Sequence, residues 1–285
     1  MRVGEELLTL AGTADGAVLI VGTGRDAGKT TTLHAMYRAA VRRGLRVAVA
    51  SVGRDRGSSG AVAKPRLELA AGTVFASARG MLPASPACRI LRVTALPSPN
   101  GCVLFAAVAT DAPYEVTGPP TAAGMREAIA QLRDYSDLVF IDGAVDRVAA
   151  LAGTNGGVVV AAGAADASTV EEAAVDVGAL VARLRVPAYD PREPSVTVDG
   201  ALTPARASAL MLQRESRQVV VNDPTQITLR GRAAIEAFDR LRIRCRRALR
   251  VVAATVAPVA PSRHFEPVAF GAAVADATGL PTYDV

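Results

Sequence analysis

The sequence predicts an α/β protein built on a mostly parallel sheet flanked by helices. Three observations lead to this prediction. Short apolar runs take turns with amphipathic segments along the chain. Within each run nearly every residue is apolar, without the apolar–polar alternation of a half-exposed strand. A glycine-containing loop joins the first run to the first helix. Continuous apolar strands are typical of a sheet covered on both faces. Half of the 285 residues are hydrophobic, which suffices for a large core.

The first strand–helix–strand unit is expected within residues 17–53. Residues 17–23 form a continuous apolar run, and residues 30–43 have the i, i+3, i+4 apolar spacing of a helix that stops at Gly44. Residues 45–53 form the next apolar run. Two strands joined so closely through a helix predict a right-handed parallel crossover.

The alternation continues to residue 184 and then repeats on a smaller scale. The first part has further strands expected at 101–109, 137–143 and 156–163, and helices at 122–135 and 168–184. After a cluster of prolines and charges, we expect strands at 195–202, 217–229 and 249–257, and helices at 203–214, 231–241 and 266–278. We therefore predict a first domain over residues 1–190. Residues 191–285 are predicted to form a smaller α/β region, either a lobe of its own or a continuation of the same fold.

The loop after the first strand has the sequence GTGRDAGKTTT and is predicted to bind phosphate. The common pattern G-x-x-x-x-G-K-[ST] places its first glycine at position 23, where this chain has Thr23. Gly22 and Gly24 flank that position. A loop one residue longer still presents its amides to phosphate, because glycines adopt the dihedral angles that such a turn requires. The first domain is thus predicted to be a P-loop nucleotide-binding domain.

Lysine usage singles out Lys29 within this loop. Of the 32 basic residues only Lys29 and Lys64 are lysines. A flexible ammonium can curl under a phosphate where a planar guanidinium fits poorly. The predicted nucleotide-binding residues are Gly22, Thr23, Gly24, Arg25, Asp26, Ala27, Gly28, Lys29, Thr30 and Thr31. The predicted cofactors are ATP and Mg²⁺, and the residues leave GTP open as the nucleotide.

Three residues are predicted to hold the metal. Thr30 begins the helix after the loop, so its hydroxyl faces the magnesium position of a phosphate loop. Asp142 ends the apolar run 137–143 and reaches the carboxyl edge of the sheet. Asp55 follows the second strand at the same edge, with solvation of a loop as the alternative to a metal or water role. The predicted catalytic set is Lys29, Asp55 and Asp142.

Several function classes are excluded or disfavoured by composition. A dinucleotide-binding turn needs an acid at the end of the second strand, where residues 50–53 are ASVG. The net charge of +5 comes from acidic and basic residues mixed along the chain, and aromatics are scarce, so nucleic acid is not an expected partner. The arginines of 229–250 are expected to form a solvated helical face, with docking to an acidic partner as the alternative.

Hydropathy and cysteine usage point to the cytoplasm. No run of about 18 apolar residues is present, and two glutamates stand where a signal peptide would be cationic. We therefore expect neither membrane insertion nor secretion. Cys88, Cys102 and Cys245 have no metal-ligand or disulfide spacing, so we expect them to be buried apolar residues.

The segment GTGRDAGKT resembles the loop of the dethiobiotin synthetase-like branch of P-loop proteins, whose first glycine also precedes the lysine by seven residues. A closer resemblance runs from about residue 17 to the end. Its segments are SVGRD (51–55), KPRLELAAGTVFASA (64–78), DLVFIDGAVDR (137–147), GGVVVAAGAA (156–165), DGALT (199–203) and VVVNDPTQITL (219–229). In this order they resemble the P-loop (KamB-type) subunit of the reactivase that serves lysine 5,6-aminomutase and ornithine aminomutase.

This resemblance implies an ATP-binding component that acts with a MutS-like ATPase subunit. Together they would restore an adenosylcobalamin-dependent aminomutase by nucleotide-driven release of damaged cobalamin. The sequence leaves open whether ATP hydrolysis requires the partner, and on this hypothesis Asp146 and Arg147 couple the nucleotide to the partner surface. The family pattern leads us to expect a glycine and then an acid directly after Asp55, where the chain has Arg56 and Gly57.

Two alternatives belong to other functional classes. A dethiobiotin synthetase-like ligase places a Lys-Pro pair at the end of the second strand, whereas Lys64-Pro65 comes later in this chain. A partner-switching maturation ATPase, which works as a homodimer, has a second early lysine in its loop. Here Arg25 is the only cation at that place.

Overall fold

The structure is a computed structural model that describes residues 2–12, 16–24, 26–51, 66–82, 87–143, 145–261 and 263–285. The chain divides into two compact units. Unit 1 comprises Met1–Ile20 and Leu33–Ala150, and unit 2 comprises Val21–Thr32 and Leu151–Val285. The domain boundary predicted after residue 190 falls inside unit 2 and stays a prediction.

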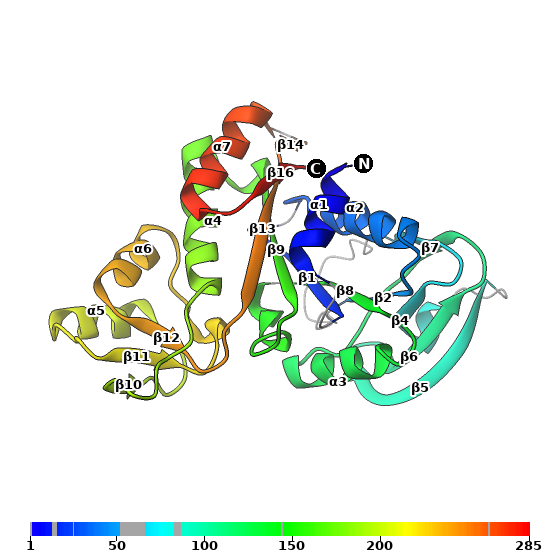
Figure 1. Cartoon of the computed structure of the whole chain (residues 1–285), viewed down its shortest axis with the longest axis horizontal. Coiled ribbons are helices and arrows are strands. Elements are labelled where there is room, and N and C mark those ends of the chain that lie inside the picture. The colour runs from blue at the N-terminus through cyan, green and yellow to red at the C-terminus, as the bar shows by residue number, and fades with distance from the viewer. Residues whose placement is uncertain are drawn as a thin grey trace. The chain divides into compact units, whose positions relative to one another are not determined.

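Unit 1 is built on a sheet with the strand order β1-β8-β2-β4-β6-β5 (Figure 1). Its strands are β1 (Ala17–Gly22), β2 (Val47–Ser51), β4 (Val74–Ala78), β5 (Cys88–Ser98), β6 (Gly101–Val108) and β8 (Leu138–Asp142), beside a small pair of β3 (Leu67–Leu69) and β7 (Ala112–Tyr114). The helices are α1 (Arg2–Ala11), α2 (Lys29–Arg42), α3 (Ala122–Leu132), η1 (Arg79–Met81) and η2 (Val145–Ala150). Strands β1, β8, β2 and β4 are parallel.

Burial along these strands follows the apolar pattern of the sequence. Every residue of β1, β2 and β4 is buried, and in β8 only Asp142 is half-buried. β6 pairs antiparallel with β4 and β5, so the edge of this sheet is a hairpin. One face of β5 is exposed, including Ile90 and Val93.

Unit 2 contains a three-stranded parallel arrangement and a second small sheet. β9 (Gly157–Gly163), β13 (Arg250–Ala257) and β16 (Thr282–Asp284) are parallel, in the order β16-β13-β9. The second sheet consists of β10 (Ser195–Thr197), β11 (Gln218–Val221) and β12 (Ile243–Cys245), also parallel. The remaining elements are η3 (Ala164–Asp166), α4 (Val170–Leu184), α5 (Pro204–Leu212), η4 (Pro224–Gln226), α6 (Gly231–Arg240), the hairpin β14 (Val259–Ala260) and β15 (Arg263–His264), and α7 (Pro267–Thr278).

The second sheet has its own core, to which α4 contributes. Leu202, Val219, Val221 and Ile227 are fully or almost fully buried there, together with Ala179 of α4. Within the predicted region 191–285, β10 to β12 thus form a separate sheet, whereas β13 and β16 extend the arrangement begun by β9.

The predicted α/β class with a mostly parallel sheet is confirmed. Most predicted elements are present at their expected places. Several others were not predicted, among them α1, the pair β3–β7, and strands β4, β5, β12 and β16. The prediction of buried cysteines was wrong for Cys102, which is exposed near the start of β6, and Cys88 is half-buried. Cys245 is buried, and desolvation raises the pKa of its thiol to about 11. Among the described residues, no helix has the length and hydropathy needed to cross a bilayer.

Candidate functional site

The predicted phosphate loop leaves a fully buried strand and enters a helix. Val21 and Gly22 end β1, and α2 begins at Lys29. The amide of Thr23 donates a hydrogen bond to the carbonyl oxygen of Ala161 on β9, at 3.0 Å. The first residue of the loop is therefore hydrogen-bonded to β9, a strand of unit 2.

Lys29 folds back over this loop. A Cβ added to Gly22 would lie 2.9 Å from Cγ and 3.0 Å from Cδ of Lys29, so the lysine stem packs directly on the Gly22 backbone. The ammonium group donates a hydrogen bond to the carbonyl oxygen of Gly24. The positive charge is thus held against the loop backbone instead of extending into solvent.

Two residues of the loop have left-handed backbone conformations. Asp26 has φ = 57° and Gly28 has φ = 84°. A non-glycine residue in this region is uncommon and often accompanies a functional turn. Backbone turned in this way directs successive amides toward one side, which is the geometry of anion-binding loops. Ala27 between them is buried and Asp26 is exposed.

Strands β9 and β13 support the loop at close range. A Cβ on Gly163, the last residue of β9, would lie 2.5 Å from Cα of Ala27. A Cβ on Gly28 would lie 2.8 Å from Cβ of Ala257 at the end of β13. Neither position has room for a side chain. The role of Gly163 was not predicted, although a glycine at the end of a predicted buried strand is a signal of close backbone approach.

The first turn of α2 presents three threonines in different surroundings. Thr32 is buried, its hydroxyl is 2.8 Å from that of Thr255 on β13, and its amide donates to the Gly28 carbonyl at 2.9 Å. Thr30 is half-buried and Thr31 is exposed. No acidic residue lies in this turn. The positive end of the helix dipole is therefore not neutralised by its own side chains.

Asp142 belongs to unit 1 and ends β8. It is in register with Ile20 on β1 and with Ser51 on β2. The Ser51 hydroxyl donates to the Asp142 carbonyl oxygen at 3.2 Å, and the Gly143 amide donates to the Ile20 carbonyl oxygen at 3.3 Å. Within the described part of the chain, the half-buried Asp142 carboxylate has no hydrogen bond or ion pair of its own. A cation or a water-bound metal is a suitable partner for such a carboxylate.

A buried loop adjoins the end of β2. A Cβ on Gly118 would lie 2.5 Å from the Ser51 carbonyl oxygen, so residues 117–119 pack against that strand end. This support for the carboxyl edge of the unit 1 sheet was not predicted.

The remaining predicted site residues are not described. Arg25, Asp55 and the pair Lys64-Pro65 lie outside the described residues, as do the side chains of Asp146 and Arg147. Among the side chains that are described, no three His, Cys, Asp or Glu residues gather closely enough to hold a metal ion by themselves. A magnesium ion that takes most of its ligands from phosphate and water needs no such cluster.

No known protein family, no characterised protein and no solved structure matches this chain. The site is therefore interpreted from its own geometry and from the residues that form it.

Gly163→Ala tests the support beneath the loop. The added methyl would meet the backbone of Ala27, which cannot move without moving the loop, so we expect the free energy of unfolding to fall by about 1–3 kcal/mol. Urea denaturation measures this change. The matched control is Gly271→Ala on α7, where the added atom has no neighbour within 4 Å and a gain of roughly 0.5–1 kcal/mol is expected. A Gly163→Ala protein as stable as the wild type would contradict the close packing.

Proposed function

We propose that the chain binds a nucleoside triphosphate, ATP by expectation, through the loop 22–31. The observation that supports this most directly is the position of Lys29. Its stem lies on Gly22 and its ammonium lies on the loop backbone, at the start of a helix whose first turn carries no acid. A helix N-terminus with free amides and a nearby ammonium is a site for phosphate.

The described residues fit this ligand. The left-handed Asp26 and Gly28 orient the loop amides, and the glycine at position 22 leaves room for the lysine stem. The helix dipole stabilises a partly buried anion by up to about 2 kcal/mol. Hydrogen bonds to charged groups add about 1.5–3 kcal/mol each. In this proposal the loop amides and Lys29 contact the β- and γ-phosphates.

We assign magnesium binding to Thr30 and Asp142, with Asp55 as the third candidate outside the described residues. Asp142 is chosen because it ends a buried strand at the carboxyl edge of its sheet and its carboxylate lacks a partner among the described residues. Magnesium bound with the nucleotide would neutralise charge on the phosphates. The Thr30 hydroxyl and the Asp142 carboxylate would orient it, and Lys29 would stabilise the negative charge that develops during transfer of the terminal phosphate.

For the use of the nucleotide, we propose the reactivase function implied by the resemblance of the segments between residues 51 and 229. In this proposal the chain works with a MutS-like ATPase subunit on an adenosylcobalamin-dependent aminomutase. Nucleotide binding and hydrolysis would change a partner surface and release damaged cobalamin. The phosphate loop supports the nucleotide part of this proposal, and the aminomutase part rests on the resemblance.

Lys29→Ala is expected to weaken ATP binding by about tenfold or more, because the lost ammonium makes a charge-assisted contact. Lys29→Arg should fail similarly, since the planar guanidinium cannot follow the lysine stem over Gly22. Calorimetric titration with Mg-ATP measures both variants. Arg38→Gln, an exposed position on α2, is the control and should bind like the wild type. Equal affinity of wild type and Lys29→Ala would refute the site.

Asp142→Asn tests the metal assignment separately from the phosphate contacts. We expect ATP affinity without magnesium to stay within about twofold of the wild type, while the strengthening by magnesium is reduced, because an amide is a weaker magnesium ligand than a carboxylate. Titrations with and without magnesium measure the difference. Asp134→Asn, an exposed carboxylate on unit 1, is the control. An undiminished magnesium effect in Asp142→Asn would remove this residue from the site.

The reactivase function is tested with an aminomutase inactivated by damaged cobalamin. The wild-type chain, with its ATPase partner, ATP and fresh adenosylcobalamin, should restore activity, and Lys29→Ala should not. The recovered aminomutase rate is the measurement. If the purified chain alone instead consumed a diamine-derived acid with bicarbonate and ATP, the ligase alternative would be correct and the reactivase proposal wrong.

A further inference from the structure

A pair of buried threonines links the first turn of α2 to strand β13. The hydroxyl oxygens of Thr32 and Thr255 lie 2.8 Å apart, and both residues are fully buried. Both belong to unit 2. The only other polar residue that is fully buried in the described part of the chain is Ser77, whose hydroxyl donates to a backbone carbonyl oxygen. Thr32 and Thr255 instead bond each other, side chain to side chain.

Stability alone gives no reason for this pair. Valine has nearly the shape of threonine and packs in a core without a hydroxyl that must find a partner. Replacing both members of a buried hydrogen bond by apolar groups of the same shape is nearly neutral for stability, or even favourable. Two valines would lack direction, because a hydrogen bond fixes which residue of the helix faces which residue of the strand. The pair is therefore suited to positioning α2 on β13.

Thr255 lies at the level of the sheet where β9 also holds the loop. It is in register with Ala161 of β9, whose carbonyl oxygen accepts the hydrogen bond from the Thr23 amide. Figure 1 shows β9 and β13 side by side. The loop is thus bonded to two neighbouring strands, at Thr23 near its start and at Thr32 just past its end.

The bond at Thr32 acts on the residues that are proposed to contact the nucleotide. Lys29 and Thr30 precede Thr32 in the first turn of α2. The Thr32 amide also donates to the Gly28 carbonyl oxygen at 2.9 Å, so this turn is joined to the end of the loop. Thr32 is the last residue of α2 that belongs to unit 2. A displacement of the turn from β13 would carry the Lys29 stem off Gly22.

We infer that Thr255 is a positioning residue for the proposed phosphate site. Through Thr32, its hydroxyl holds the first turn of α2 in place before a ligand binds. It acts through Lys29 and Thr30, since its own hydroxyl is buried against Thr32. A site that is ordered in advance binds more tightly, because less conformational freedom is lost on binding. The effect on affinity rests on the proposed function, whereas the ordering of the free loop does not.

Thr255→Val tests this role through the affinity of the full chain for Mg-ATP, measured by calorimetric titration. We expect binding about threefold to tenfold weaker than in the wild type, as for the loss of one neutral hydrogen bond. Thr255→Ser keeps the hydroxyl and should bind within about twofold of the wild type.

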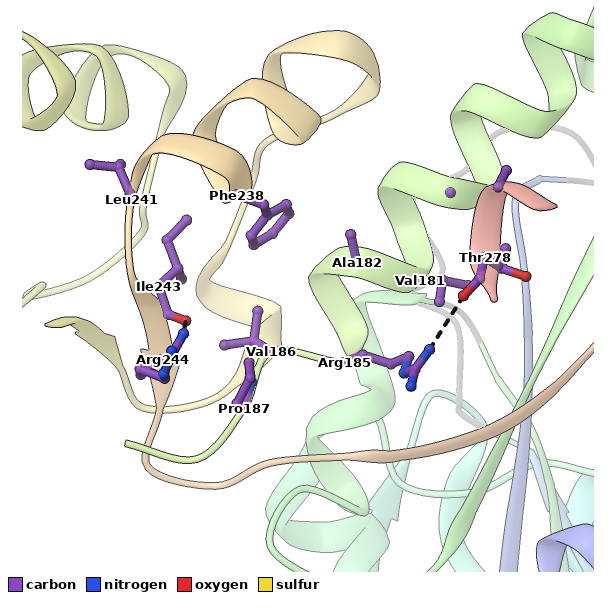
Figure 2. A pocket seen from close by; sticks show the side chains of 12 residues that line it. Val181, Ala182, Arg185, Val186, Pro187, Phe238, Leu241, Ile243, Arg244 and Thr278 are labelled. Atoms are coloured by element: carbon purple, nitrogen blue, oxygen red, sulfur yellow. Dashed lines mark hydrogen bonds between the residues drawn. The ribbon is translucent and has the colours of Figure 1, made fainter. Parts of the chain in front are cut away.

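Thr278→Val is the matched control. Thr278 is buried, and its hydroxyl donates within α7 to the Val274 carbonyl oxygen at 2.7 Å. It borders the cavity beside the C-terminal part of α4 that Figure 2 shows, and no residue of the loop lines this cavity. The control should lose stability, because a buried hydrogen bond is lost, and should keep the wild-type affinity for Mg-ATP.

The double variant Thr32→Val, Thr255→Val separates positioning from stability. Thr255→Val alone leaves the Thr32 hydroxyl buried without its wild-type partner, so the urea midpoint should fall. The second valine removes that hydroxyl, and the midpoint should return toward the wild-type value. The affinity for Mg-ATP should stay as low as in Thr255→Val, because the directional bond is still absent. Recovery of the affinity together with the midpoint would overturn the inference, since the loss would then come from the unpaired hydroxyl.

Hydrogen exchange of the Thr32 amide in the nucleotide-free chain tests the inference without ATP. In the double variant this amide should exchange at least about threefold faster than in the wild type, because local opening of the turn is easier. If the wild type bound no Mg-ATP but the exchange rate rose as expected, the proposed function would be wrong and Thr255 would still position the loop. If the wild type bound Mg-ATP and the double variant matched it in affinity and exchange, the proposed function would stand and the role of Thr255 would be refuted.

Discussion

The close approach of the phosphate loop to the ends of β9 and β13 is the constraint on which the candidate site depends. Gly163 and Gly28 meet the backbone or side chain opposite at distances that exclude a Cβ atom. This contact determines where the left-handed residues of the loop lie and where α2 begins. The position of Lys29 follows, because its stem needs the open surface over Gly22 that the loop path provides. In the predicted phosphate site, close packing therefore positions the loop, and the electrostatic contacts depend on that position.

The loop lies in unit 2, and the strand and helix that it joins each have residues in both units. Strand β1 has Ala17–Ile20 in unit 1 and its last two residues in unit 2, and α2 has its first turn in unit 2 and the rest in unit 1. A ligand that orders the loop acts on β1 and α2 together, because both are continuous through it. In the proposed reactivase, this continuity offers a direct physical route from phosphate binding to a change elsewhere in the chain. Such a route requires that the ligand bind two arrangements of these segments with different affinity.

The sequence predicted the features that local pattern encodes. Apolar runs and helical spacing predicted the positions of β1, α2 and β8. The Gly-Lys-Thr segment predicted the turn that leads from β1 into α2. Contacts between distant segments were not predicted, because no local pattern relates Gly163 or Thr255 to the loop. The antiparallel hairpin of β5 and β6 was missed for the same reason, since strand direction is decided by pairing and not by composition.

The choice between arginine and lysine distinguishes the predicted phosphate loop from the rest of the surface. Arginine suits an ion pair on the surface, as where the Arg46 guanidinium donates from Nε and Nη2 to Oδ1 of Asp137. The loop needs a cation on a narrow flexible stem, and there the chain has Lys29 over Gly22. In a protein that uses arginine almost everywhere, a lysine packed over a glycine indicates that the position needs a narrow cation. This signal identifies the loop more sharply than the net charge of the chain does.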